Sequence, residues 1–372
     1  MSDGDAGGHR PHYYGGQAVI EGVMMRGRHA WAVAVRRPSG KIYLERHPVN
    51  DAASRRPVLA KPFVRGPWAM VDALKMGTRA LTVSANQSVD QDEQLSGKEM
   101  GSSLLIALVL FIGVFIVLPN AGLAFLSDRI GDGTLYHFIE GVLRIVMFLG
   151  YLLAISMLSD IRRVFAYHGA EHQTIAAWEH DEPLQPDRVN QYSTLHVRCG
   201  TNFVIMLMLL AVLVYSVAGV IVPAPDGGIV ATATYHVLLR ILLLPVIVSL
   251  AYEGLRLGAG RKSNPVVRML MKPGLWLQKI TTRPSSPDQR EVAIRAFQAV
   301  VPVDEYAKQP RPTDETELSA PLVWGPDDSH GTTYVLMPPD EPADDEGIVS
   351  RGENPAGDQE VVPPGEEPRS GY

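Results

Sequence analysis

Two histidines four residues apart form the sharpest chemical pattern in this sequence. They belong to the run YHGAEH at residues 167–172. On a helix, residues i and i+4 project from one face a turn apart, so His168 and His172 would converge on one tetrahedral metal ion. The spacing His-x-x-Glu-His is that of the inverted zinc proteases, in which the glutamate, here Glu171, is the general base. The pattern predicts a divalent metal centre, with zinc as the expected ion.

A second polar run, HVRCG at residues 196–200, offers further ligands. Either His196 or Cys199 could be the third ligand, leaving a fourth position open for water, and Glu171 is a candidate for base or third ligand. Arg198 could hold an anionic substrate or a lipid phosphate. The competing interpretation is a solvated polar helix near the bilayer that binds no metal.

The elements that must position these residues are membrane helices. Four stretches, at about 104–126, 135–158, 203–223 and 229–251, are apolar over the 18 or more residues needed to cross roughly 30 Å of hydrocarbon at about 1.5 Å per residue. The sequence therefore predicts an α-helical polytopic membrane protein with about four transmembrane helices.

The basic residues predict how these spans are oriented. Residues 1–103 contain 14 Lys and Arg and residues 256–283 contain seven, whereas the turns at 127–134 and 224–228 contain only Arg129. By the positive-inside rule, both termini and the loop 159–202 are expected in the cytoplasm, with the spans in the plasma membrane. The single cysteine fits a reducing compartment.

The sequence divides the chain into four regions, of which the C-terminal tail is the last. Residues 1–12 are expected to be disordered, and residues 13–100 to form a small cytoplasmic α+β module. Its strands are predicted at Gln17–Met25, Ala30–Arg36 and Lys41–Arg46, followed by an amphipathic helix over Arg65–Ala85 that leads toward the membrane or packs on the strands. The membrane domain then covers 101–300, with a cytoplasmic helix over 162–179.

The C-terminal tail differs in composition from the rest of the chain. Residues 301–372 contain 17 acidic and 4 basic side chains, and 12 of the 28 prolines. We expect this tail to be disordered.

Charged residues also occur inside the predicted spans. Glu140 and Arg144 are four apart in the second span and can form an ion pair, while Arg240 in the fourth span has no acidic partner there. Glu140 would therefore serve both arginines. A structural ion pair between helices is the first interpretation, and a proton or ion path is the second.

Some classes of function are disfavoured by the sequence. The pair Gly15-Gly16 precedes a predicted strand and no Gly-Lys-Ser/Thr follows, so nucleotide hydrolysis is not expected. Basic residues are not arrayed with aromatic residues on one face, so nucleic acid is not an expected partner.

Several motifs together resemble the YqhQ family of bacterial membrane proteins. They are GGQAVIEGVMMRG at 15–27, YHGAEH at 167–172, RCGT at 198–201 and PGLWLQ at 273–278 with TT at 281–282. The family is a domain of unknown function with the label of a predicted metal-dependent enzyme. The resemblance adds Glu21 and Arg26 as candidates for a site shared with the His168 cluster. Val197, Gln173 and Arg283-Pro284 depart from the family pattern, but none replaces a proposed ligand.

These observations lead to one main hypothesis and two alternatives. The main hypothesis is a metal-dependent, hydrolase-like enzyme whose site lies on the cytoplasmic face. The first alternative is a non-enzymatic membrane scaffold or assembly factor that binds another membrane protein, which suits a basic body with an acidic tail. The second is a transporter, based on the charges inside the spans. In each case the lipid bilayer is a partner.

Overall fold

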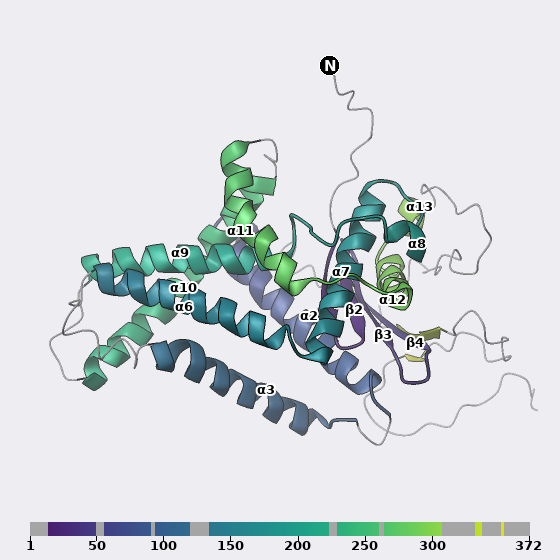
Figure 1. Cartoon of the computed structure of the whole chain (residues 1–372), viewed down its shortest axis with the longest axis horizontal. Helices are drawn as coiled ribbons and strands as arrows, with labels where there is room; N and C mark the ends of the chain where they lie inside the picture. The colour runs from purple at the N-terminus through teal and green to yellow at the C-terminus, as the bar shows by residue number, and fades with distance from the viewer. Residues whose placement is uncertain are drawn as a thin grey trace, which may run out of the picture.

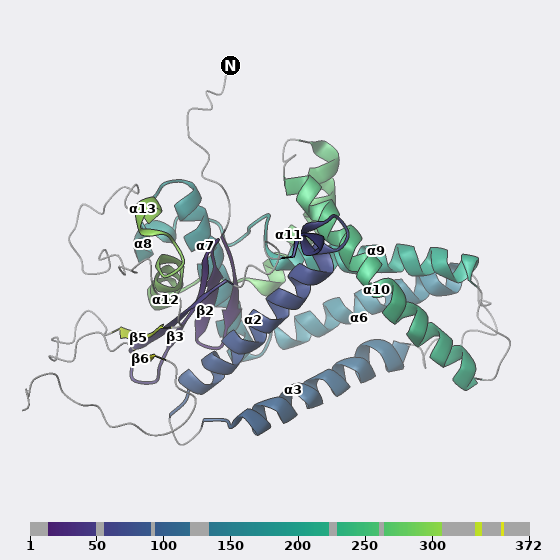
Figure 2. The same cartoon turned by 180° about the vertical axis from the view of Figure 1, so that it is seen from behind.

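The computed structural model describes residues 14–49, 56–90, 94–119, 134–222, 229–259, 264–306, 332–336 and 351–352. Long apolar helices occupy one end of the molecule, and a small β-sheet with its covering helices forms the other (Figures 1 and 2). The protein is thus an α-helical membrane protein with a small N-terminal sheet, as the sequence predicts.

Four helices in the described part of the chain are long and apolar enough to cross a membrane. They are α3 (Gly97–Ile112), continued by the π-helical turn η3 (Gly113–Val117), α6 (Thr134–Ile155), α9 (Gly200–Ile221) and α10 (Ile229–Ala259). Outward side chains such as Leu110 and Leu242 are 62% and 73% exposed, which suits contact with lipid rather than water. The four predicted spans are confirmed; positions 120–126 of the first and 223 of the third lie outside the described residues.

The N-terminal sheet is built from antiparallel strands that follow one another in chain order. The first four are β1 (Gly15–Val19), β2 (Gly22–Arg26), β3 (Ala30–Arg36) and β4 (Ile42–Pro48). Consecutive strands are joined by short turns, so each hairpin forms from local sequence.

The prediction of one strand over Gln17–Met25 is wrong, because the chain reverses in the middle of this run. Val19 pairs with Gly22 across a two-residue turn, and Glu21 in that turn has a φ of 51°. A Cβ at Gly22 would lie 2.3 Å from the carbonyl oxygen of Ala34, so the close approach of β3 requires glycine here. The run concealed a hairpin because β2 is buried over its first four residues and shows no alternation of polar and apolar side chains, whereas β1 is exposed over residues 15–17.

The two faces of the sheet pack against different helices. On one face, Val23, Met25 and Leu44 join a core with α7 (Ser159–Glu179) and α12 (Pro287–Gln298). On the other face, Met24 and Val33 pack against Met76 and Ala80 of α2. This alternation follows the two-residue period of strand side chains. The globular part is therefore assembled from segments on both sides of the membrane helices in the sequence.

Helix α2 (Arg65–Gln87) confirms the predicted amphipathic helix, and it packs on the strands, which is one of the two alternatives for it. Its small residues, including Gly77, Ala80 and Ser84, face the sheet, whereas Leu74 on the other side is 61% exposed. The same helix thus packs on the strands and presents an apolar face away from them. The sidedness arises because positions three and four apart share a helix face.

The remaining described elements are short or follow the last span. They are η1 (Pro57–Ala60), α8 (Pro186–Val189), α11 (Pro265–Thr281), α13 (Val303–Tyr306), β5 (Thr332–Leu336) and β6 (Arg351–Gly352). Strand β5 pairs with β4, and β6 pairs with β5. Most of the predicted disordered tail, and residues 1–12, lie outside the described residues.

Candidate metal centre and the adjoining groove

Helix α7 presents His168 and His172 on one face, as their spacing predicts. Their ring centroids are 4.4 Å apart. Gly169 between them lies against the chain segment that follows α11, where a Cβ would come within 2.1 Å of the carbonyl oxygen of Arg283. Only glycine allows this approach, which brings the backbone at Thr281 next to His168.

Backbone carbonyls orient both imidazole rings. Nδ1 of His168 lies 2.8 Å from the carbonyl oxygen of Thr281, and Nδ1 of His172 lies 2.5 Å from that of Thr194. A carbonyl only accepts hydrogen bonds, so each Nδ1 carries the proton and each Nε2 keeps its lone pair. This arrangement, with Nδ1–H on a carbonyl and Nε2 directed elsewhere, is common for metal-binding histidines.

The sulfur of Cys199 lies where these two nitrogens converge. Nε2 of His168 is 3.2 Å from Sγ of Cys199, and the ligand atoms of His168, His172 and Cys199 lie within 4.8 Å of one another. Cys199 is the N-cap of α9, and the backbone N–H and hydroxyl of Thr201 donate to its sulfur. The sulfur is thus held at the positive end of a helix.

The donor set fits a zinc-type ion. Nε2 of His172 is buried and has no hydrogen-bond partner of ordinary geometry, so a lone pair is left unsatisfied in the interior. Burial lowers the pKa of His172, which favours the neutral imidazole that a metal requires. Two imidazoles and a thiol are ligands that zinc prefers.

Glu171 lies beside the cluster but is not one of its three convergent ligands. Its side chain is buried, the backbone N–H of Gly16 donates to it, and Oε2 has no hydrogen-bond partner. Burial raises the pKa of the Glu171 carboxyl, although the nearby charges of His168 and His196 act in the opposite direction. A Cβ at Gly16 would lie 2.9 Å from Cδ of Glu171, so strand β1 closes over the carboxyl.

His196 is adjacent to the cluster and is held by different partners. Its ring centroid lies 5.6 Å from that of His172, and its Nε2 is 3.7 Å from Oε2 of Glu179. Its backbone N–H donates to Oε1 of Gln278, and Nε2 of Gln278 donates to its carbonyl, both at 2.8 Å. Arg198 forms an ion pair with Glu179. Sequence reasoning did not identify Gln278 as the side chain that clamps this loop.

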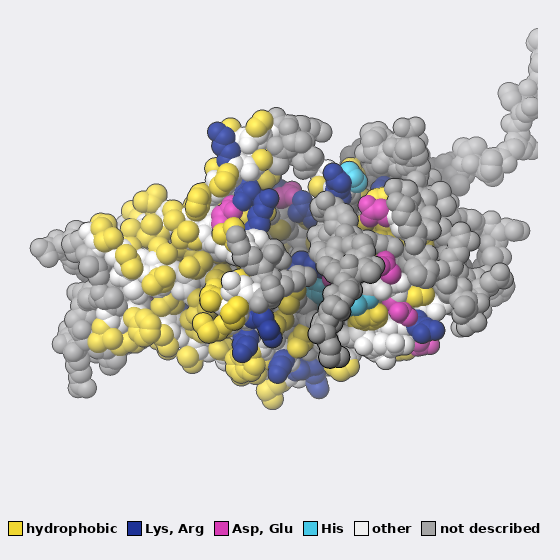
Figure 3. Space-filling model, turned by 90° about the horizontal axis from the view of Figure 1, so that it is seen from above, with side chains coloured by type: hydrophobic (Ala, Val, Ile, Leu, Met, Phe, Trp, Pro, Cys, Tyr) yellow, Lys and Arg dark blue, Asp and Glu magenta, His cyan; other side chains and the backbone are white. Residues whose placement is uncertain are grey.

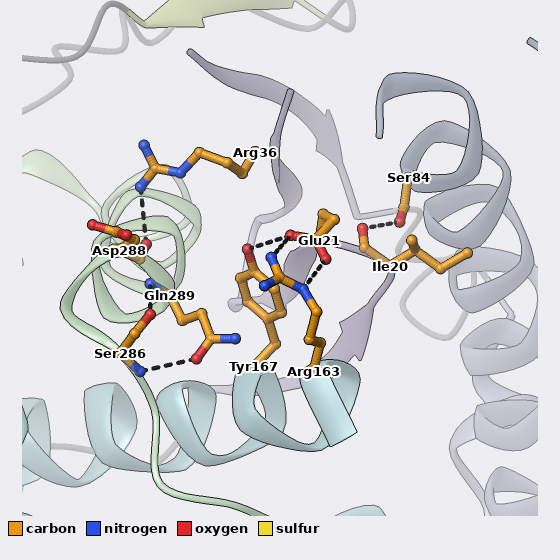
Figure 4. A network of polar contacts seen from close by, with 9 residues as sticks. All are labelled: Ile20, Glu21, Arg36, Ser84, Arg163, Tyr167, Ser286, Asp288 and Gln289. Carbon is orange, nitrogen blue, oxygen red and sulfur yellow. Dashed lines mark hydrogen bonds and ion pairs between the residues drawn. The ribbon is translucent and has the colours of Figure 1, made fainter. Parts of the chain in front are cut away.

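Glu21 contacts α7 through Arg163 and Tyr167, as Figure 4 shows. Nε of Arg163 donates to its carboxylate at 2.6 Å, and the hydroxyl of Tyr167 donates at 3.2 Å. The hydroxyl of Ser84 binds the carbonyl of Ile20 in the same turn from the side of α2. Burial raises the pKa of Tyr167, which keeps its hydroxyl protonated as a donor. These contacts fix the β1–β2 turn between two helices.

Arg26, the other candidate from the N-terminal motif, forms an ion pair with Asp72 of α2 at 2.9 Å. It also lines a cavity of about 1120 Å³, which we call the groove. The walls of the groove come from α2, α10, α11 and residues 197–203. Arg198 and Cys199 line it as well, so the groove reaches the edge of the histidine cluster.

A separate polar cluster lies inside the membrane helices. Nη2 of Arg144 is 2.6 Å from Oε1 of Glu140, and Nη2 of Arg240 on α10 reaches the same oxygen at 2.5 Å. Nε of Arg144 also donates to the carbonyl of Phe115. The expectation that Glu140 serves two arginines is confirmed.

Comparisons with known proteins identify relatives along most of the chain. Residues 61–303 match the family described as "Protein of unknown function (DUF1385)". The uncharacterized protein YqhQ of Bacillus subtilis (strain 168) is 33% identical over 313 residues, covering 80% of this chain and 95% of that protein. No solved structure matches the chain.

Proposed function

The chain belongs to the YqhQ family of proteins of unknown function (DUF1385), and on this premise we propose that it is a metal-dependent, hydrolytic enzyme of the plasma membrane. Its site would face the cytoplasm, because Lys and Arg are concentrated in the segments on the globular side of the spans.

One observation carries the proposal. Both imidazoles direct Nδ1 to a backbone carbonyl, so both Nε2 atoms are available to the point where Sγ of Cys199 lies. A solvated helix that binds nothing has no reason to orient two rings in this way, or to bury Nε2 of His172 without a partner.

The residues of the chain would divide the chemistry among them. A zinc ion held by His168, His172 and Cys199 would supply Lewis acidity and lower the pKa of water. Glu171 would accept and return a proton, since its raised pKa brings it closer to neutral pH than an exposed glutamate. Arg198, at the edge of the groove, would hold an anionic group of the substrate.

Elemental analysis of the detergent-purified protein tests the metal site. We expect about one zinc or similar ion per chain in the wild type, and its loss in the His168→Ala/His172→Ala double variant. His180→Ala is the matched control, because His180 is exposed at the end of the same helix, where its Nδ1 binds the carbonyl of Ala176. This control should retain the ion.

Cobalt substitution tests the sulfur ligand separately. Cobalt in the wild type should show a sulfur-to-metal charge-transfer band, which Cys199→Ser should abolish. Absence of an ion from the wild type, or equal ion content in the double variant, would contradict the proposal. That result would favour the scaffold hypothesis and a search for co-purifying membrane proteins.

A further inference from the structure

The groove is larger and more apolar than the metal chemistry alone requires. Its volume of about 1120 Å³ exceeds the roughly 300–1,000 Å³ of pockets for drug-sized ligands. One wall is the outward face of α2, with Leu74 and Leu81, and the opposite wall is α11, with Met271 and Leu275. Such walls suit hydrocarbon chains.

The charged residues that line the groove are all cationic. They are Arg26, Arg198, Arg256, Arg268 and Lys272. Arg26 and Arg198 have ion pairs with Asp72 and Glu179, but no acidic side chain of the described residues lines the groove itself. Arg268 and Lys272 are four apart on α11, where two like charges repel unless an anion lies between them. The groove is therefore complementary to an anion with an apolar body.

The groove lies where two membrane helices meet the globular part. Gly200 and Phe203 at the start of α9, and Tyr252 and Leu255 near the end of the last span, belong to its lining. Figure 3 shows Lys and Arg gathered between the hydrophobic surface of the helix bundle and the other end of the molecule. A molecule in the adjacent leaflet can reach such a groove by lateral diffusion.

We propose that the groove binds an anionic phospholipid from the leaflet on the globular side. Its acyl chains lie along α2 and α11, and its phosphate lies near Arg256, Arg268 and Lys272. This binding is independent of the metal. The additional step, that the lipid headgroup is presented to Cys199 as a substrate, rests on the proposed function.

Lipid retention in a defined mixture tests the binding. The protein is reconstituted in nanodiscs of equimolar dioleoylphosphatidylglycerol and dioleoylphosphatidylcholine and re-extracted in detergent. Retained lipid per chain is then measured by mass spectrometry. We expect the wild type to retain about one phosphatidylglycerol in preference to phosphatidylcholine. Arg268→Gln/Lys272→Gln should weaken this affinity about 30-fold, from about fivefold per lost cation near a membrane surface.

Two further variants separate charge from shape. Arg162→Gln/Lys279→Gln removes the same charge from exposed residues outside the groove lining and should leave retention unchanged. Ala73→Trp fills the groove from an exposed position on α2 and should remove both lipids. Size-exclusion profiles and melting temperatures identify variants that do not fold.

The remaining measurements distinguish failure of the lipid site from failure of the metal site. His168→Ala/His172→Ala should retain the lipid, so failure of the metal site and failure of the lipid site are separate results. Equal retention of both lipids by the wild type would overturn the proposal. So would an unchanged preference in Arg268→Gln/Lys272→Gln, or displacement of the lipid by an equal concentration of glycerol 3-phosphate.

Discussion

Glu140 inside the membrane helices and Glu171 on α7 are both buried carboxyl groups, yet their surroundings differ. Two arginines from different helices bind Glu140. Glu171 receives a backbone N–H from Gly16, has an oxygen without a hydrogen-bond partner, and lies beside His172, whose Nε2 also lacks one. Ion pairs with Arg144 and Arg240 balance the charge of Glu140 and hold the membrane helices together. The cluster that contains Glu171 and His172 keeps polar atoms available, which is the condition for binding and proton transfer.

The largest expected effect in this comparison concerns stability. Glu140→Gln leaves the partly buried Arg144 and Arg240 without their counter-charge inside the helix bundle, and should lower the free energy of unfolding by about 3–5 kcal/mol. Glu171→Gln keeps an oxygen that can accept the hydrogen bond from the backbone N–H of Gly16. This substitution should change the free energy of unfolding by about 1 kcal/mol or less. Denaturant unfolding of both variants in one detergent measures the difference. Equal losses would show that the two carboxyls have the same structural role.

A smaller effect is expected at the glycine that shapes the candidate metal site. Gly169→Ala forces the backbone at Arg283 away from α7, with a cost of about 1–3 kcal/mol. The shift also withdraws the Thr281 carbonyl from His168, so zinc affinity should fall about 10- to 100-fold. Gly150→Ala is the control, since no heavy atom lies within 4 Å of a Cβ built there. Competition with a chromophoric chelator measures the affinity, and an unchanged value in Gly169→Ala would refute this role.

The smallest expected effect is a pH dependence of the folding stability. It concerns Glu45, a carboxylate with ion-pair partners in the same globular part as Glu171. Burial alone would raise the pKa of Glu45, but a hydrogen bond from His47, with contributions from Tyr43 and Arg79, brings the pKa below its ordinary value. A lowered pKa in the folded state contributes stability above about pH 4.5, and this contribution is lost as the pH falls through the folded pKa. Glu45→Gln should therefore flatten the acid side of the stability curve, by up to about 1.4 kcal/mol per pH unit. Urea titrations between pH 3 and 6 test it, with an unchanged acid slope as the contrary result.

Local patterns in the sequence were sufficient for much of the architecture. Hydropathy over a window of helix length predicts the four spans, because lipid requires continuous apolar helices. Helical periodicity likewise predicts α2 and the shared face of His168 and His172. The double pairing of Glu140 followed from counting charges inside the spans, where an unpaired arginine is costly.

The hairpin within residues 17–25 shows where this reasoning fails. Its second strand, β2, is apolar on both faces because helices cover both sides of the sheet there, so the two-residue alternation that marks a half-buried strand is absent from it. The signal that could have found the turn was the pair Glu21-Gly22 within an otherwise apolar run.

By itself, the sequence determined the membrane class, the number of spans and the spacing of two imidazoles, since each depends on residues within one helix. Only the tertiary structure decided between His196 and Cys199 as the group nearest to both histidines, since residues 196–199 belong to a loop without periodicity. It also decided the existence of the groove, whose lining combines segments as distant in the sequence as Arg26 and Leu275. Contacts between distant segments depend on how helices and strands pack, and no local pattern of residues encodes them.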